Sequence, residues 1–382
     1  MKVENKEIIY FDNAATTVVD PLVLAKYYET QNKYFANPSS IHKLGQEAYY
    51  LLNNSKEDIL SLLRYKDGQV VYLSGATEAN NLAIKGVALR YQNRGNHLIT
   101  SIYEHPSVLE AFKQLEEHFG FKVTYLTPNK DGVITPEKIK ESLTDKTILV
   151  SLMAVNNEIG SINPIEEIAT LLKGYPKVIF HVDASQAIGK IEINCNDVDL
   201  FTISAHKMHG LVGFGALVKK KKIDLLSLNS GGGQEYGYRS GTEDLANAIA
   251  FKLTLEESLT HLKERYLHVK ELSDRLLSYL SKHEDLFELN TPKEINPYVI
   301  NFSSLTKKGS VIVEALSNAN IMVSSVSACH SSKEVGSYVV KSLGKSEKAI
   351  NNTIRVSFSY MNTLEEVDIL ISTLDKIIGD IR

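Results

Sequence analysis

One lysine and one aspartate in this chain follow apolar segments that are typical of buried strands. Lys207 comes shortly after the run 198–203, and Asp183 ends the run 178–183. A lysine at the end of a buried strand does not serve packing, because its ammonium group resists burial. An amine and a carboxylate delivered in this way suit pyridoxal phosphate, since the amine forms a Schiff base and the carboxylate keeps the pyridine nitrogen protonated. A lysine in a solvated loop has the same sequence surroundings, so these two residues alone leave the question open.

A second group of residues suits the binding of a phosphate. The stretch 73–81 reads Leu-Ser-Gly-Ala-Thr-Glu-Ala-Asn-Asn, follows the apolar run 70–73 and opens a helical pattern. Backbone N–H groups at a helix start, together with the hydroxyl of Thr77, form a site for an anion. An ordinary helix cap made by Thr77 or Ser74 explains the same residues, so the stretch does not decide between the two.

Three further segments carry side chains that could take part in chemistry. His105 precedes a proline where a strand pattern gives way to a helix. Its imidazole could lie over an aromatic ring, although a single histidine is more often a surface or core residue. Asn156 and Asn157 follow another apolar run as a pair of amides. The loop 324–332 is rich in small residues and carries Cys329.

Taken in order, these segments resemble those of the class V aminotransferase family of pyridoxal-phosphate enzymes, and more narrowly the cysteine desulfurases of the NifS/IscS type. The likeness runs from Tyr-Phe-Asp-Asn-Ala-Ala-Thr-Thr at 10–17 to Ile-Arg-Val-Ser at 354–357, which is nearly the whole chain. The matched motifs also include 37–42, 75–81, 181–186, 204–207, 231–235 and 239–242. Each motif is a modest signal, whereas their collinear order at the family's spacing is a strong one.

The resemblance implies a full set of cofactor contacts. Lys207 would form the Schiff base with pyridoxal 5'-phosphate, Asp183 would pair with the pyridinium nitrogen, and Gln186 would bond the ring oxygen. His105 would stack on the ring and take part in catalysis. The phosphate would be held by Ala76, Thr77, Ser204 and His206, with Thr242 reaching the phosphate of a partner subunit. The last contact implies a homodimer with shared active sites.

The resemblance also implies the substrate contacts and the reaction. Arg355 would pair with the carboxylate of L-cysteine, and Asn157 would assist it or contact the ring oxygen. Lys207 would remove the Cα proton, and the thiolate of Cys329 would attack the substrate's sulfur. The products would be L-alanine and a persulfide on Cys329, for delivery to an acceptor protein in iron–sulfur cluster assembly or tRNA thiolation. Cys195 matches no family motif and is expected to be a structural or surface thiol.

Strand-like and helical patterns alternate from about residue 45 to residue 220, which predicts a mostly parallel sheet covered by helices. The motifs fall at the carboxyl ends of the predicted strands, where such sheets bind ligands. Together with the resemblance, this implies the α/β fold type I of pyridoxal-phosphate transferases, with a seven-stranded sheet in a large domain over 15–255. A smaller α+β domain would comprise 1–14 and 256–382 and carry the cysteine loop and Arg355.

The pattern also gives local expectations for the rest of the chain. One long charged helix over 253–283 would connect the two domains, and a final amphipathic helix would cover 365–378. Strands are expected near 297–302 and 353–357. The four lysines at 219–222 are expected to form a solvated turn.

The composition of the chain argues against several other classes of function. The 382 residues carry a net charge of −4, so no global field attracts nucleic acid or an anionic membrane. No apolar run approaches the roughly 20 residues that span a bilayer. Two cysteines suggest neither a disulfide framework nor a metal site, and they suit a protein of the reducing cytoplasm.

Four positions depart from the family's usual residues. Val326 stands where glycine is usual, Leu211 and Val212 replace a Pro-Lys pair, and Tyr236 replaces an arginine. None of these changes removes a proposed catalytic group. Two alternatives to a cysteine desulfurase remain: a selenocysteine lyase or another class V lyase or aminotransferase, and a non-catalytic interaction scaffold. Cys329 argues against a simple aminotransferase, which needs no thiol at that place.

Overall fold

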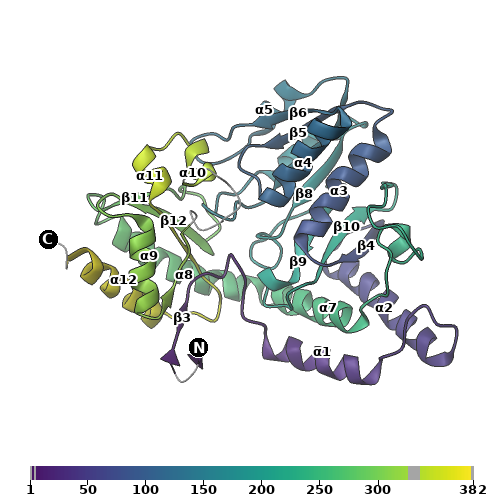
Figure 1. The fold of residues 1–382 in the computed structure, drawn as a ribbon, viewed down its shortest axis with the longest axis horizontal. Helices are drawn as coiled ribbons and strands as arrows, with labels where there is room; N and C mark the ends of the chain where they lie inside the picture. Colours follow the sequence, from purple (N-terminus) through teal and green to yellow (C-terminus); the bar gives the residue numbers. More distant parts are fainter. Residues whose placement is uncertain (1, 4–5, 326–335, 380–382) are drawn as a thin grey trace.

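A seven-stranded sheet forms the centre of the molecule in a computed structural model that describes residues 2–3, 6–325 and 336–379 (Figure 1). The strand order is β4-β10-β9-β8-β7-β5-β6, and only β10 runs antiparallel to its neighbours. The strands are β4 (Gly68–Leu73), β5 (His97–Ser101), β6 (Lys122–Leu126), β7 (Thr147–Met153), β8 (Ile179–Asp183), β9 (Leu200–Ser204) and β10 (Gly215–Lys220). The mostly parallel sheet that the sequence predicts is confirmed.

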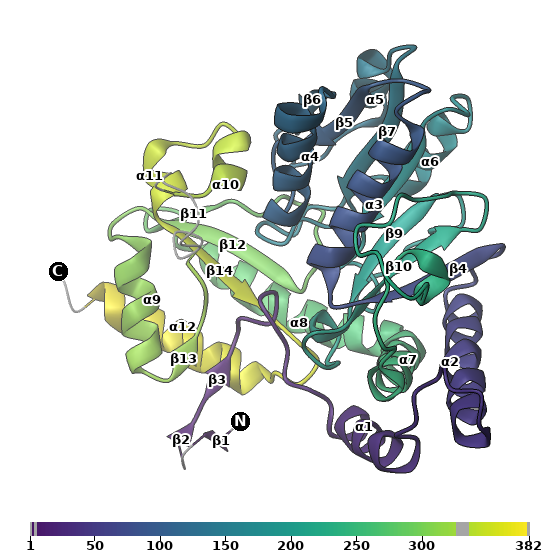
Figure 2. The ribbon, with the colours of Figure 1, turned by 45° about the vertical axis from the view of Figure 1, so that its right-hand side comes forward.

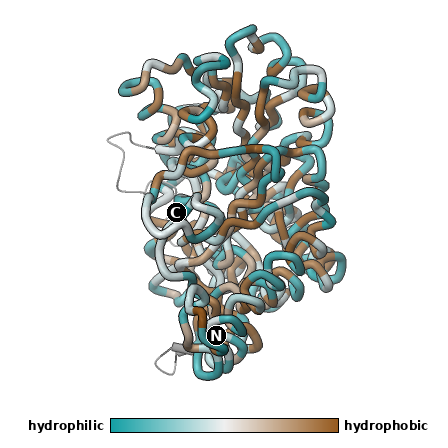
Figure 3. The backbone as a smooth tube through the Cα atoms, turned by 90° about the vertical axis from the view of Figure 1, so that its right-hand side faces the viewer, coloured by the Kyte–Doolittle hydropathy of each residue, from teal (hydrophilic) through white to brown (hydrophobic). Residues whose placement is uncertain are grey.

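Helices cover both faces of this sheet, which explains why its strands read as nearly continuous apolar runs. In β4, Val71 and Leu73 pack against α3 (Ala76–Tyr91) and α4 (Pro106–Phe119) on one face. Val70 and Tyr72 of the same strand join the core of the opposite face. The helices of that second core are α2 (Lys43–Leu62), α5 (Pro136–Ser142), α6 (Ile165–Leu172) and α7 (Leu245–Thr260), joined from the C-terminal part of the chain by residues of α10 (Tyr338–Ser342) and α11 (Glu347–Asn351). Figure 3 shows hydrophobic segments running through the interior of the molecule.

The C-terminal part of the chain has a separate hydrophobic core beside the large sheet (Figure 2). Its antiparallel sheet has the order β11-β12-β14. The N-terminal segment belongs to this core, because Phe11 is fully buried in it and β3 pairs in parallel with β13. The elements of this region are β3 (Ile9–Tyr10), α8 (Leu262–Leu280), β11 (Phe287–Leu289), β12 (Val299–Ser304), α9 (Gly309–Asn318), β13 (Ile321–Met322), α10 (Tyr338–Ser342), α11 (Glu347–Asn351), β14 (Thr353–Ser357) and α12 (Leu364–Gly379).

The remaining elements are short, apart from one helix at the edge of the molecule. They are β1 (Lys2–Val3), β2 (Lys6–Glu7), α1 (Pro21–Lys33), and the two single-turn helices η1 (Ala205–Lys207) and η2 (Glu235–Gly237). Helix α1 packs against α7 in the lower part of Figure 1. No helix in the described part of the chain has both the length and the apolar character to cross a membrane.

The prediction of one connecting helix over 253–283 is wrong. Two helices, α7 and α8, occupy this stretch, and they meet at His261, whose φ of −99° and ψ of 12° are not helical. The two helices serve different cores, because Leu255 of α7 packs under the large sheet whereas Leu272 of α8 packs in the C-terminal core. A helical period alone does not show where the buried face changes direction.

The prediction of a solvated turn at 219–222 is wrong for its first half. Strand β10 continues to Lys220, and the side chain of Lys219 is fully buried. The Nζ atom of Lys219 donates to Oε1 of Gln69 at 2.8 Å and lies 4.9 Å from the ring centroid of Tyr238. Burial lowers the pKa of Lys219 to about 8. A hydrogen bond and an aromatic face therefore replace the water that the sequence pattern suggested.

Candidate active site

The carboxyl ends of β7, β8 and β9 lie side by side and bring the candidate residues to one edge of the sheet. Strand β8 pairs in parallel with β7 on one side and with β9 on the other. Asp183 is the last residue of β8, Asn157 follows β7, and η1 with Lys207 follows β9. Parallel strands thus collect residues that are far apart in the sequence, as the pattern predicted.

The amine of Lys207 lies against the N-terminal segment. Its Nζ atom donates to the carbonyl oxygens of Ala14 at 2.7 Å and Ala15 at 2.6 Å. Desolvation lowers the pKa of Lys207 to about 8, and the positive charge of Arg355 acts in the same direction. The charges of Asp183 and Asp12 oppose this shift. Near neutral pH a fraction of this amine is therefore uncharged, which is the form that reacts with an aldehyde.

The carboxylate of Asp183 is nearly buried and held by three donors. Its Oδ1 atom accepts from the hydroxyl of Ser185 at 2.6 Å and from the Ser185 backbone N–H at 3.0 Å. Its Oδ2 atom accepts from Nδ2 of Asn80 at 2.8 Å. These bonds fix the orientation of the carboxylate at the end of β8.

His105 caps the start of α4, and its side chain is only partly accessible there. Its Nδ1 atom accepts from the backbone N–H of Ser107 at 3.1 Å and lies 2.9 Å from the Ser107 hydroxyl. Desolvation lowers the pKa of His105, and the charge of Lys207 acts in the same direction while that of Asp183 opposes it. The imidazole is therefore neutral at pH 7.

Gln186 is oriented by a lysine that the sequence analysis missed. The Nζ atom of Lys190 donates to Oε1 of Gln186 at 2.6 Å, so the amide nitrogen of Gln186 points the other way, to the carbonyl of Ala14 at 3.0 Å. Lys190 is buried, and this burial, followed by the charges of Lys207 and Arg355, lowers its pKa to about 7. Its one signal in the sequence was a lysine between two isoleucines, Ile188 and Ile191.

The start of α3 leaves open space for an anion. Gly75, just before Ala76 and Thr77, has a φ of +145°, and a Cβ atom there would meet nothing within 4 Å. Strand β10 approaches closely at Gly215, where a Cβ atom would lie 3.0 Å from the Cα of Gly75. The two glycines let strand and helix meet while the backbone N–H groups of the first turn stay accessible.

Ser204 and His206 lie at the end of β9 next to Lys207. The hydroxyl of Ser204 is buried and has no hydrogen-bond partner among the described residues. Nδ1 of His206 lies 3.1 Å from the hydroxyl of Thr16, and desolvation, followed by the charges of Lys207 and Lys190, lowers the pKa of His206 to about 4. A buried unpaired hydroxyl and a neutral imidazole suit the oxygens of a bound phosphate.

Thr242 lies on the surface, in a hollow that it shares with Ser74 and Phe214. Its segment is tied to α3 through Glu78, whose carboxylate accepts from the Ser74 backbone N–H at 2.7 Å and from Nε of Arg239 at 3.3 Å. The structure therefore places Thr242 on the outside of its own chain. Its contact with the phosphate of a partner subunit stays a prediction.

Arg355 supplies the cationic side of the site from β14. Its two terminal nitrogens donate to the backbone carbonyl of Asn157 at 3.0 Å and to Oδ1 of Asp12 at 2.8 Å. The Nε atom of Arg355 and Oδ1 of Asn157 are buried and have no hydrogen-bond partner in the described part of the chain. The guanidinium is thus held by Asp12, a carboxylate that the sequence analysis did not single out.

Cys329 and Val326 lie outside the described residues. The chain before this stretch is joined to Arg355, because Ser324 and Arg355 exchange two backbone hydrogen bonds of 3.1 and 2.8 Å. The chain after it is joined to the large sheet, because the hydroxyl of Ser337 donates to Oε2 of Glu158 at 2.6 Å. Cys195, by contrast, is buried and its pKa is raised by that burial to about 12, so it has the character of a structural thiol.

The donors of this site fit pyridoxal phosphate better than a metal ion. An amine, a fixed carboxylate, a neutral imidazole and an open helix start match an aldehyde, a ring nitrogen, a ring face and a phosphate. Within the described ranges, no group of three or more His, Cys, Asp or Glu side chains is placed to hold a metal. Fold and site together define a pyridoxal-phosphate enzyme built on a mostly parallel α/β sheet.

Comparison with known proteins gives the family. The model of the aminotransferase class-V family matches residues 9–370, so the chain belongs to this family of pyridoxal-phosphate enzymes. A cysteine desulfurase IscS of Pseudomonas syringae pv. tomato is 41% identical over 371 residues, which is 94% of this chain and 90% of the relative.

Solved structures agree with this assignment. A NifS-like protein superposes with a TM-score of 0.90 at 32% identity, over 98% of this chain and 100% of that one. A protein described as SspA in complex with cysteine gives a TM-score of 0.79 at 31% identity, over 93% of this chain and 100% of that one. The expected α/β fold type I is thereby confirmed.

Proposed function

We propose that this chain is a cysteine desulfurase, which moves sulfur from L-cysteine to the thiol of Cys329 and releases L-alanine. The observation that carries the proposal is that Lys207 and Arg355 are held by one short segment of the chain: Nζ of Lys207 donates to the carbonyls of Ala14 and Ala15, and Arg355 donates to Asp12. An amino acid whose carboxylate binds Arg355 therefore presents its Cα–H to a partly neutral amine. The relatives named as cysteine desulfurases and the cysteine complex of a structural neighbour favour cysteine as that amino acid.

The cofactor would be held at both ends. Lys207 would bind its aldehyde carbon, Asp183 its ring nitrogen and Gln186 its ring oxygen, while His105 covers the ring. The phosphate would be held by Ala76, Thr77, Ser204 and His206, together with Thr242 of a partner subunit. When bound, pyridoxal phosphate supplies an electron sink for the negative charge that develops at the substrate's Cα.

The chain's own residues then divide the work. Arg355 binds the substrate carboxylate in place of Asp12, with Asn157 beside it, and Nζ of Lys207 takes the proton from Cα. The Cys329 thiolate attacks Sγ of the substrate, so that an S–S bond forms as the Cβ–Sγ bond breaks. The electron pair of the broken bond stays on carbon. Protonation of Cβ, and return of the proton from Nζ of Lys207 to Cα, then give L-alanine.

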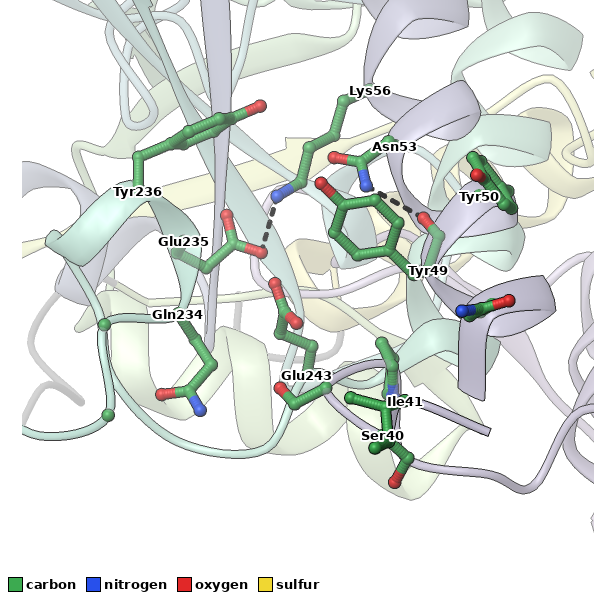
Figure 4. A pocket seen from close by; sticks show the side chains of 15 residues that line it. Ser40, Ile41, Tyr49, Tyr50, Asn53, Lys56, Gln234, Glu235, Tyr236 and Glu243 are labelled. Atoms are coloured by element: carbon green, nitrogen blue, oxygen red, sulfur yellow. Dashed lines mark hydrogen bonds and ion pairs between the residues drawn. The ribbon is translucent and has the colours of Figure 1, made fainter. Parts of the chain in front are cut away.

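A homodimer is part of the proposal. Large apolar side chains are exposed close together at the start of α2, namely Ile41 at 92%, Tyr50 at 65% and Tyr49 at 52%. Next to Ile41 lies a hollow between α2 and the segment 232–236 (Figure 4). Exposed apolar patches of this kind mark interfaces, and a second copy seated here would bring Thr242 to its partner's site. The molar mass in solution tests this, with Ile41→Asp expected to shift it toward the monomer.

The hollow also explains one departure from the family. Lys56 forms a buried ion pair with Glu235 at 2.9 Å, and its Nζ lies 4.7 Å from the ring centroid of Tyr236. An arginine at position 236 would place a second positive charge beside Lys56. The aromatic ring instead offers a favourable contact for the ammonium group.

Several finer statements complete the proposal. The persulfide would pass to an acceptor in iron–sulfur cluster assembly or tRNA thiolation, in the cytoplasm. The large domain would comprise 15–255 and the small domain 1–14 and 256–382. The separate C-terminal core, which includes Phe11 and α8, favours a division of this kind, with the change from one core to the other at His261.

The test is incubation of the cofactor-loaded protein with L-cysteine, followed by assays for alanine and for bound sulfur. We expect alanine and one persulfide, on Cys329. Cys329→Ser should abolish sulfur transfer, and Cys195→Ser should leave it intact, since that thiol is buried. A strong preference for selenocysteine over cysteine would favour the selenocysteine lyase instead. Loss of activity in Cys195→Ser but not in Cys329→Ser would refute the assignment of the nucleophile.

A further inference from the structure

A chain of hydrogen bonds connects Asp183 to His105 through the buried side chain of Asn80. Asn80 has no exposed surface, and its Nδ2 atom lies 2.8 Å from Oδ2 of Asp183 and 2.9 Å from the hydroxyl of Ser107. The Ser107 hydroxyl in turn lies 2.9 Å from Nδ1 of His105. Three elements therefore meet at one amide: α3 through Asn80, β8 through Asp183, and the start of α4 through His105 and Ser107.

The direction of each bond follows from chemistry. A carboxylate only accepts, so the amide nitrogen of Asn80, not its oxygen, faces Asp183. The same nitrogen donates its second hydrogen to the Ser107 hydroxyl, and this leaves the hydroxyl's own hydrogen for Nδ1 of His105. Oδ1 of Asn80 is buried without a partner in the described part of the chain, so the amide is turned by the two bonds of its nitrogen.

We propose that Asn80 is a positioning residue, which sets His105 relative to Asp183 and holds its imidazole in the neutral form that carries the proton on Nε2. The proposal rests on the proposed cofactor site for the role of the two groups, but not for the hydrogen-bond chain itself. A charged imidazole would need Nδ1 to donate. That nitrogen instead faces two donors, the backbone N–H and the hydroxyl of Ser107.

The charged groups around His105 do not account for the neutral form alone. Asp183 favours the imidazolium, while Lys207 and desolvation oppose it. Glu104, which precedes His105 in the chain, is buried and its pKa is raised by that burial to about 8, so it carries little charge at pH 7. The hydrogen-bond chain favours the neutral imidazole, as desolvation does, and opposes the effect of the Asp183 carboxylate.

The test is the titration of His105 by NMR in the protein free of cofactor. Asn80→Ala frees the Ser107 hydroxyl to accept a proton from the imidazolium. We expect the midpoint of His105 to rise by about one pH unit, since one hydrogen bond to a charged group is involved. Asn81→Ala is the matched control: Asn81 is the next residue of α3, and its amide bonds the carbonyl of Thr77, so the midpoint should not move.

Ser107→Ala distinguishes an effect that passes through the hydrogen-bond chain from a general loosening of the structure. If Asn80 acts through Ser107, then Asn80→Ala should add little to the midpoint shift already present in Ser107→Ala. Additive shifts, or a His105 midpoint that does not move in Asn80→Ala, would overturn the proposal, whatever the effect on thermal stability. Loading with pyridoxal phosphate gives a second readout, in which Asn80→Ala should weaken cofactor binding roughly tenfold. A protein that binds no cofactor in any form would refute the proposed function, but not the hydrogen-bond chain.

Discussion

The two halves of the site are prepared for their ligands in different ways. On the large sheet, Asp183 is held by three donors and Gln186 is turned by Lys190. These partners fix the orientation of the two side chains, and they leave a donor and an acceptor available for a cofactor. On the C-terminal side, Arg355 is bound to Asp12, which is a carboxylate like that of an amino acid substrate.

The large-sheet half is therefore already arranged for its ligand, whereas in the C-terminal half Asp12 occupies the guanidinium that a ligand carboxylate would need. A cofactor can enter the first half without breaking an ion pair, whereas a substrate carboxylate that binds Arg355 as proposed would displace Asp12. Under the proposed function, the large-sheet half would control how tightly the cofactor binds, and the C-terminal half how tightly the substrate binds. Substitutions on the two sides should affect different constants.

The largest effect is expected at Lys207, where the two halves meet. Under the proposed function, Lys207→Ala removes both the anchor of the cofactor and the base that moves the Cα proton. Turnover of L-cysteine should fall by about a thousandfold or more, because a positioned base alone contributes roughly 10²–10⁴. Alanine formation measures the loss, and an unchanged melting temperature shows that the fold is intact. Retention of a tenth of the activity would contradict the assigned role.

The next effect is expected at Arg355. Arg355→Gln removes the charge that is proposed to bind the substrate carboxylate, so KM for L-cysteine should rise by about a hundredfold. It also removes a positive charge that lowers the pKa of Lys207, so the Lys207 amine should titrate at higher pH. Arg275→Gln is the control, because Arg275 forms an exposed ion pair with Asp368 at 2.7 Å. It should change neither quantity.

A smaller effect of opposite sign is expected at Asp12. Asp12→Asn weakens the hold on Arg355, so the substrate carboxylate meets less competition and KM should fall by about threefold, within the range of a single ion pair. Asp12 also raises the pKa of Lys207, so that amine should titrate at lower pH in the variant. Asp368→Asn serves as the control. A higher KM in Asp12→Asn would show that Asp12 orients the guanidinium instead of competing for it.

The smallest effect is expected from Lys190, and it appears in the pH dependence of stability. Its pKa is lowered from 10.5 to about 7 in the folded chain, so between these values the unfolded chain binds more protons. Stability should therefore rise with pH through this window, and Lys207, at about 8, adds to the rise over its upper part. Lys190→Met should flatten the slope in urea unfolding of the cofactor-free protein. An unchanged slope would show that folding does not lower the pKa of Lys190.

The sequence predicted the parts of the site that depend on strand position. Asp183 and Lys207 follow apolar runs, and parallel pairing of β8 and β9 is enough to bring them together. The partners of these residues could not be predicted. Arg355 and Asp12 are 343 positions apart, and Asn80 meets Asp183 across 103 positions, so no local period reports either contact. Lys219 and the break at His261 were missed for a related reason, since a pattern shows burial but not what a buried group pairs with.

The most direct test of the site is the identity of the lysine that holds the cofactor. Lys190 lies in the same region and has the lower pKa, about 7 against about 8, so basicity alone would favour it. The position of Lys207 at the end of β9 favours Lys207 instead. We predict that borohydride reduction of the protein loaded with pyridoxal phosphate, followed by digestion and mass spectrometry, places the label on Lys207. A label on Lys190, or on any other lysine, would contradict this structure of the site.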